Sequence, residues 1–91
     1  MNVANLQLEG LLMAVAAVNR LLVHKGVVSA QEIDAALKEA EASECRSDDI
    51  PPANREAIVF PIRLLRLANQ QPPAAELPSF PALTRTVGQM R

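Results

Sequence analysis

The chain has 91 residues, of which 49% are hydrophobic, and a formal net charge of −1; these values indicate one small folded domain, 1–91, and exclude a fully disordered chain. The only aromatic residues are Phe60 and Phe80, which excludes a stacking platform for single-stranded nucleic acid. One cysteine allows no internal disulfide and one histidine leaves little for a metal site, so we expect no metal and no cofactor.

The first predicted element is a helix over residues 4–24. Apolar residues recur there at three- and four-residue spacing and form a main stripe: Leu8, Leu11, Leu12, Val15, Val18 and Leu22. Gly26 follows at the position where a glycine commonly ends a helix in the left-handed conformation. We expect the main stripe to face the core.

A second apolar stripe lies opposite the main one on the same helix. It consists of Leu6, Gly10, Met13, Ala17 and Leu21. A surface helix needs one apolar face, so two faces indicate either a central place in the bundle or a contact with another chain. Asn19 falls within the main stripe, where an amide either fixes register or oligomeric state or bonds a loop carbonyl of its own chain.

The predicted helix 4–24 lacks the sequence features of a membrane span and of a signal peptide. Its longest uninterrupted apolar stretch runs from Leu11 to Val18, whereas a membrane span needs roughly 20 such residues. The first charged residue is Glu9, whereas a signal peptide begins with basic residues. We therefore expect a soluble, cytoplasmic protein that contacts no membrane.

A second helix is predicted over residues 29–44. Ser29 at the N-cap and Glu32 three residues later form a capping box, and Val28 and Ile33 form a hydrophobic staple around it. Its apolar face is thin and consists of Ile33, Ala36, Leu37 and Ala40. The connection 25–28 is so short that the first two helices must be neighbours.

A third helix is predicted over residues 54–70. One apolar side consists of Ile58, Ile62, Leu65 and Ala68, and another of Phe60, Leu64 and Leu67. Pro61 lies inside this stretch and removes a backbone hydrogen bond, so we expect a kink or a break into two shorter helices.

Charge is unevenly distributed between the second and third helices. Residues 29–50 carry seven acidic against two basic residues, and residues 51–91 carry five arginines against two glutamates. Arg55, Arg63 and Arg66 form a basic ridge on the third helix. Because the second helix offers acidic partners, we expect intramolecular pairs more than a phosphate or nucleic-acid contact.

The C-terminal segment 71–91 extends from a helical core of residues 1–70. Its prolines predict an extended stretch over 71–82, and Ser79, Phe80 and Pro81 are typical of the start of a short helix that ends near Gln89. The stripe of that helix would be Phe80, Leu83, Val87 and Met90. The sequence therefore predicts an all-α bundle of three to four helices with a Pro-rich C-terminal segment packed on it.

The segment Leu21–Glu32 resembles a connector in other proteins. It is similar to segments in the N-terminal domains of secretion ATPases and near the start of nitrile hydratase subunits, and covers less than a fifth of the chain. The resemblance implies a helix–turn–helix geometry and no activity. The cysteine cluster that binds metal in nitrile hydratases is absent here.

No catalytic residues can be assembled from this sequence. His24 is expected to be an exposed residue at a helix end, and Cys45, among acidic neighbours, a small half-buried residue. We therefore expect no enzyme and no small-molecule substrate. The favoured hypothesis is a protein-interaction module, as a homodimer or an accessory subunit, that uses the second stripe or the Pro-rich C-terminal segment. The alternative is a nucleic-acid-binding regulator that uses Arg55, Arg63 and Arg66.

Overall fold

The fold of the chain is all-α. The computed structural model describes residues 3–46, 49–72 and 76–89. Within these ranges the chain forms four helices and no strand: α1 (Val3–His24), α2 (Ala30–Cys45), α3 (Pro52–Asn69) and α4 (Phe80–Gln89). The predicted all-α class is confirmed. Each predicted helix is present, and each begins within two residues of its predicted start.

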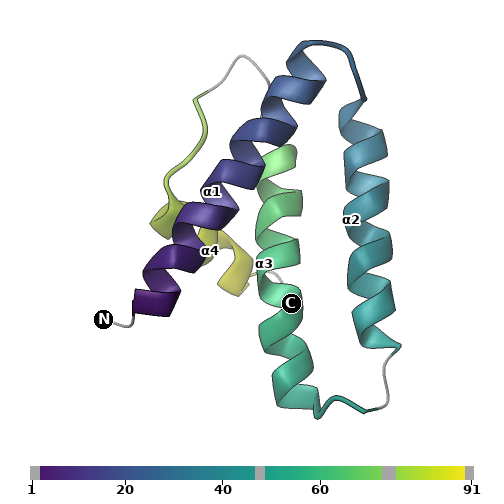
Figure 1. Ribbon diagram of the computed structural model, residues 1–91, viewed down its shortest axis with the longest axis vertical. Helices are drawn as coiled ribbons and strands as arrows, with labels where there is room; N and C mark the ends of the chain where they lie inside the picture. Colours follow the sequence, from purple (N-terminus) through teal and green to yellow (C-terminus); the bar gives the residue numbers. More distant parts are fainter. Residues whose placement is uncertain (1–2, 47–48, 73–75, 90–91) are drawn as a thin grey trace.

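Helix α3 is the centre of the bundle. The first three helices run in alternating directions, with α2 alongside α3 and α1 crossing it at an incline (Figure 1). Helices α1, α2 and α4 each pack against α3. The first two helices therefore contribute to the fold mainly through their contacts with the third.

The turn between α1 and α2 follows from local sequence. Gly26 has φ +74°, a conformation that favours glycine. The N–H of Gly26 donates to the Val23 carbonyl at 3.0 Å and the N–H of Val27 to the Leu22 carbonyl at 3.0 Å, the pattern of a Schellman motif. These bonds satisfy carbonyls at the end of α1 and turn the chain toward α2.

The predicted capping box at the start of α2 is confirmed. The backbone N–H of Ser29 donates to Glu32 Oε1 at 2.8 Å, and the backbone N–H of Glu32 donates to Ser29 Oγ at 3.0 Å. A similar signal was predicted before α4, where the Ala82 N–H donates to Ser79 Oγ at 3.3 Å. At the start of both helices, therefore, a serine hydroxyl accepts a hydrogen bond from a backbone N–H group that has no partner within the helix.

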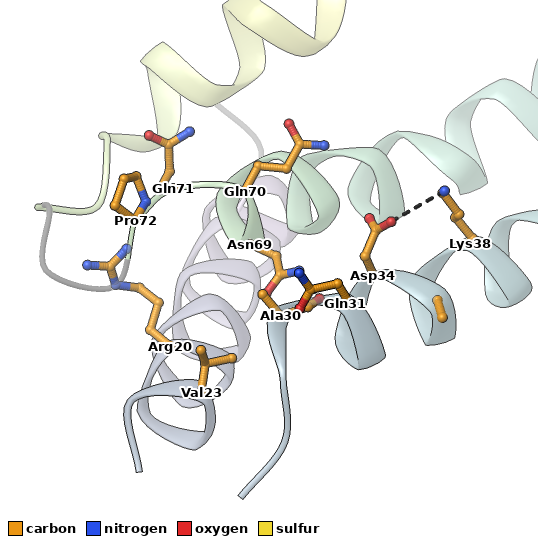
Figure 2. Close-up of a pocket in the computed structure, with 11 residues that line it drawn as sticks. Arg20, Val23, Ala30, Gln31, Asp34, Lys38, Asn69, Gln70, Gln71 and Pro72 are labelled. Atoms are coloured by element: carbon orange, nitrogen blue, oxygen red, sulfur yellow. Dashed lines mark hydrogen bonds and ion pairs between the residues drawn. The ribbon is translucent and has the colours of Figure 1, made fainter. Parts of the chain in front are cut away.

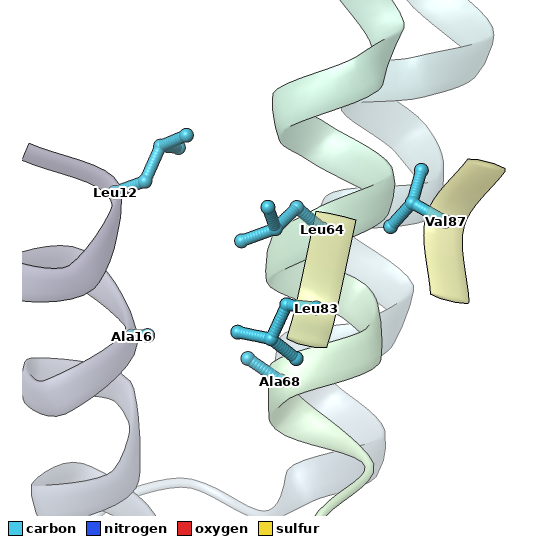
Figure 3. Packing of buried hydrophobic residues seen from close by; sticks show 6 residues of the cluster. All are labelled: Leu12, Ala16, Leu64, Ala68, Leu83 and Val87. Atoms are coloured by element: carbon cyan, nitrogen blue, oxygen red, sulfur yellow. The ribbon is translucent and has the colours of Figure 1, made fainter. Parts of the chain in front are cut away.

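The hydrophobic core lies where α1, α3 and α4 meet. Its buried residues are Leu12, Ala16, Leu64, Ala68, Leu83 and Val87. Figure 3 shows Leu12 and Ala16 on one side and Leu64, Ala68 and Leu83 on the other. Leu77 and Phe80 also pack against this cluster, so the part of the C-terminal segment next to α4 contributes to the core. Pro73 and Met90 lie outside the described residues.

The prediction for the buried side of α1 is largely wrong. Of the predicted main stripe only Leu12 belongs to the buried core, whereas Leu8, Leu11 and Val18 are exposed. Ala16, which the periodicity did not single out, is buried instead. Because α1 is apolar around most of its circumference, spacing alone could not decide which side meets α3.

Helix α3 continues through Pro61 from Pro52 to Asn69. Of the two expected alternatives, a kink or a break into two helices, the break is therefore absent. The buried residues of α3 are Val59, Leu64 and Ala68, whereas Ile58 is exposed. Pro51 and Pro52 begin the helix, where the missing N–H groups of proline cost no hydrogen bond.

Helix α2 contributes no buried residue to the fold. Ile33 and Leu37 are half-buried, and Ala36 and Ala40 of the predicted thin face are exposed. Val59, Arg63 and Arg66 share one side of α3 by their spacing. Because these two arginines bind acidic residues of α2, that side of α3 faces α2.

A candidate interaction surface on the first helix

The side of α1 that faces away from the core is exposed and apolar. We define the outer face of α1 as the positions centred opposite Leu12 and Ala16. They are Val3, Gln7, Gly10, Leu11, Ala14, Ala17, Val18 and Leu21, all of which are exposed. Leu11 is 61% exposed, Val18 55% and Leu21 54%, values unusual for large aliphatic side chains brought together on one helix face.

The outer face of α1 carries no charged side chain. Between Val3 and Val23 the charged residues of α1 are Glu9 and Arg20, and both are half-buried on the inner side. Gln7 is the single polar residue of the outer face. A solvated helix face normally carries the charged residues, so the polarity of α1 is the reverse of that expected for a surface helix.

The residues predicted for an interface divide between the two sides of α1. Leu6, Gly10, Ala17 and Leu21 are exposed, as an interface on this helix requires. Met13 packs against the core of its own chain and is therefore not part of the exposed face. Asn19 is half-buried at the margin of the core-facing side.

Sequence reasoning assigned Leu11 and Val18 of this surface to the core and placed Val3 and Gln7 in neither stripe. The small side chains of Gly10, Ala14 and Ala17 indicate from the sequence alone that another backbone could approach closely. Leu11, Ala14, Val18 and Leu21 repeat at the alternating three- and four-residue spacing of a coiled-coil seam. That spacing is the signal that would have grouped them.

Helix α1 also meets a simple criterion for a membrane span. It is long and apolar enough by length and composition alone, and only 11% of its most apolar window is buried. A core helix of a soluble protein and a signal sequence meet the same criterion. The expectation that no segment could span a membrane therefore stays a prediction.

The predicted basic ridge on α3 is largely engaged with acidic residues of the same chain. Arg66 Nε lies 3.1 Å from Asp34 Oδ1, and Arg66 Nη1 lies 3.3 Å from Glu41 Oε1. Arg63 Nε lies 3.2 Å from Glu41 Oε2, and Arg63 Nη1 lies 3.3 Å from Glu56 Oε2. The predicted intramolecular pairing between the second and third helices is therefore present.

The third arginine of the ridge has a different partner. Arg55 Nη2 donates to the backbone carbonyl of Ile50 at 3.2 Å, which ties the start of α3 to the preceding loop. The ridge thus joins α2 to α3 and ties Ile50 to the start of α3.

These ion pairs shift the pKa of two groups, Asp34 of α2 and Arg63 of α3. The hydrogen bond from Arg66 lowers the pKa of Asp34 below its ordinary value, with the charges of Arg66 and Lys38 acting in the same direction. The hydrogen bond to Glu41 raises the pKa of Arg63. Both pKa shifts favour the charged forms, of Asp34 and of Arg63.

A cavity of about 520 Å³ lies where the end of α1, the start of α2 and the end of α3 meet. Figure 2 shows Arg20 and Val23 on one side and Asp34 and Lys38 on the other. Lys38 Nζ lies 3.5 Å from Asp34 Oδ2, and Asn69 Nδ2 donates to the Ala30 carbonyl at 3.0 Å. Because Asp34, Lys38 and Asn69 already have partners within the chain, they stabilise the junction of the three helices and do not indicate a particular ligand.

The two other residues considered for chemistry are both on the surface. Cys45 is exposed, which corrects the expectation of a half-buried thiol, because it lies in the last turn of α2, the helix with no buried residue. His24 is exposed at the end of α1, as expected. Among the described residues no group of three or more His, Cys, Asp or Glu side chains is arranged to hold a metal ion.

The comparisons with known proteins provide no assignment: the sequence matches no protein-family model, and no curated protein or solved structure is detectably similar to it. The function must therefore be argued from the surface of α1.

Proposed function

We propose that this protein is a small protein–protein interaction module that acts through the outer face of α1, as a self-assembling unit or as an accessory subunit. The single observation that carries the proposal is the exposure of Leu11, Val18 and Leu21 on a face without charge. Removing such a face from water is favourable, by roughly 25 cal/mol per Å² of apolar surface.

A protein partner explains this face better than a membrane does. Helices that lie in a membrane surface carry basic residues along the polar side, whereas Arg20 is the only arginine or lysine within α1. The chain as a whole has a net charge of −1, and α2 is acidic, which disfavours anionic lipid. Inserting α1 across a bilayer would also bring Glu9 and Arg20 into the hydrocarbon.

The nucleic-acid alternative has less support. Arg63 and Arg66 already neutralise acidic residues of the same chain, so a phosphate would have to compete with Asp34 and Glu41. The adjacent acidic helix would repel a polyanion. We therefore propose neither nucleic-acid binding nor catalysis for this protein.

The proposal is tested with Val18→Glu, which places a charge in the middle of the outer face without touching the core. Val27→Glu is the matched control, because Val27 is 67% exposed and lies beyond the end of α1. The purified variants are measured by sedimentation equilibrium, and labelled protein is measured by size exclusion in extract of the source cells. Circular dichroism checks that both variants remain helical.

We expect the wild-type chain and Val27→Glu to form an assembly larger than 9.8 kDa, and Val18→Glu to lose it. A monomer of wild-type protein in both measurements would contradict the proposal. Flotation with lipid vesicles that Val18→Glu abolishes, without assembly in solution, would assign the face to a membrane instead.

A further inference from the structure

We infer that the occupant of the outer face is a second copy of this chain, whose α1 lies antiparallel to the first. This inference rests on the proposed function and specifies its partner. The paired residues would be Leu11 with Leu21 of the other copy, and Ala14 with Val18 of the other copy.

The outer face of α1 is compatible with its own copy because it carries no charge. In a two-fold symmetric dimer the same patch meets itself, so any charged residue near the axis faces a like charge. The outer face of α1 has no charged residue between Val3 and Leu21, and therefore meets itself without repulsion. A partner with a charged surface would lose hydration on this face and gain no ion pair.

The spacing of the exposed residues on α1 is that of a helix–helix seam. Leu11, Ala14, Val18 and Leu21 follow one another at intervals of three, four and three, the repeat with which two helices interlock along a seam. All four are exposed, so the seam is open to another helix. A cavity or groove would place apolar residues of several elements together, whereas here a single helix presents a line.

The outer face of α1 has space for another helix beside Gly10. Apart from the adjoining backbone of α1 and the two neighbouring residues, a Cβ atom added at Gly10 would meet no atom within 4 Å, so no other element packs against this glycine. Gly10, Ala14 and Ala17 together allow a second helix backbone to approach α1 closely, which increases van der Waals contact along the seam.

The size of the surface sets the strength of the dimer. Half of a helix cylinder from Val3 to Leu21 amounts to roughly 400 Å² per copy, or roughly 800 Å² in total. Stable dimers usually bury about 1,200–2,000 Å² or more. We therefore expect a weak dimer that dissociates on dilution.

The antiparallel direction follows from residue size and charge. Antiparallel pairing places the small Ala14 opposite the larger Val18, whereas parallel pairing would place each residue opposite its own copy. The next position in the same spacing is Lys25, which is exposed just beyond α1. Parallel pairing would bring the two Lys25 side chains together, and antiparallel pairing brings Lys25 opposite Gln7. Antiparallel helix dipoles are also favourable.

The inference is tested by cysteine cross-linking in a Cys45→Ser background, which removes the single native thiol. Leu11→Cys and Leu21→Cys are prepared separately, oxidised alone, and then oxidised as an equal mixture. Along the helix these positions are about 15 Å apart, and a disulfide requires Cα atoms within roughly 7 Å. Val27→Cys is the control for random collision, because it is exposed outside the seam.

We expect a covalent dimer from the mixture, and none above the control level from either variant alone. Adding Val18→Glu to both chains should reduce cross-linking and raise the dissociation constant by roughly tenfold or more, since about 1.4 kcal/mol is one factor of ten. Sedimentation equilibrium of the uncrosslinked protein measures that constant.

The other outcomes separate this inference from the proposed function. Efficient cross-linking of each variant alone, and none specific to the mixture, would show a parallel dimer and overturn the antiparallel arrangement only. A monomeric purified protein that gains a partner in extract through Val18 would overturn the second copy and leave the interaction module intact. A monomer under both conditions would overturn both.

Discussion

At the scale of single residues, Ser29 fixes the start of α2. Its hydroxyl accepts the Glu32 N–H, while Glu32 accepts the N–H of Ser29, so two donors at the helix end are satisfied by each other. Helix α2 has no buried residue to hold its ends in place. The cap therefore matters more to this helix than it would to a helix anchored in the core.

We expect Ser29→Ala to lower the free energy of unfolding by about 1 kcal/mol, because the Glu32 N–H loses its acceptor. Urea denaturation followed by circular dichroism measures this value. Ser43→Ala removes the same hydroxyl from an exposed position inside α2 and should change it by less than about 0.5 kcal/mol. Equal effects of the two substitutions would contradict the role of the cap.

At the scale of elements, ion pairs join α2 to α3. Glu41 accepts hydrogen bonds from both Arg63 and Arg66, and Arg66 also binds Asp34. The side chains of Arg66, Glu41 and Asp34 are between 19% and 27% exposed, so water screens these pairs less than it screens a fully exposed pair. Shared partners make the cluster a network, which stabilises more than isolated pairs do.

We expect Arg66→Met to lower the free energy of unfolding by about 1–2 kcal/mol, because Asp34 and Glu41 lose charged hydrogen bonds while the apolar stem is retained. Arg46→Met is the control, since its pair with Glu39 is more than 60% exposed on both sides. The control should cost less than about 0.5 kcal/mol. A loss at Arg66 that 1 M salt leaves undiminished would argue against an electrostatic origin.

The lowered pKa of Asp34 predicts a dependence of stability on acid pH. A carboxyl whose pKa is lower in the folded chain than in the unfolded chain stabilises the fold fully above its unfolded pKa, about 3.9. That contribution is lost as the pH falls through the folded value. We expect the free energy of unfolding to decrease as the pH falls below about 4, and Asp34→Asn to show a smaller decrease. Denaturation curves at neutral and acid pH measure the difference, and identical slopes would contradict the role of Asp34.

At the scale of the whole molecule, a small core joins α1, α3 and α4. Leu64 on the central helix is fully buried, and Leu12 and Leu83 reach it from the two other helices. Helix α2 lies outside this cluster and is attached to the opposite side of α3. Stability is therefore concentrated on one side of the bundle, and α2 is expected to exchange its amide hydrogens faster than α3.

We expect Leu64→Ala to lower the free energy of unfolding by about 2–5 kcal/mol, because it leaves a cavity among three helices. Leu6→Ala, at a position that is 49% exposed, is the matched control and should cost less. If Leu64→Ala does not fold, Leu64→Met keeps the volume and should cost less than about 1.5 kcal/mol. A small effect at Leu64 in chemical denaturation would place the core elsewhere.

The sequence by itself determined the all-α class, the positions of the helices and the signals that begin and end them. Ser29 with Glu32, Gly26 and Ser79 act through neighbours within a few residues, so these signals can be recognised in the local sequence. The acidic and basic character of α2 and α3 likewise predicted their pairing, although not that Glu41 would join both arginines.

Only the tertiary structure decided which side of α1 is buried and which is open to a partner. Its apolar residues surround most of the helix, and the burial energies of Leu12 and Leu11 are alike, so no local preference separates them. The choice depends on the shape presented by α3 and α4, where Leu64, Ala68 and Leu83 fit against Leu12 and Ala16. The continuation of α3 through Pro61 also depends on tertiary structure, because packing on both sides of α3 favours one helix over two short ones.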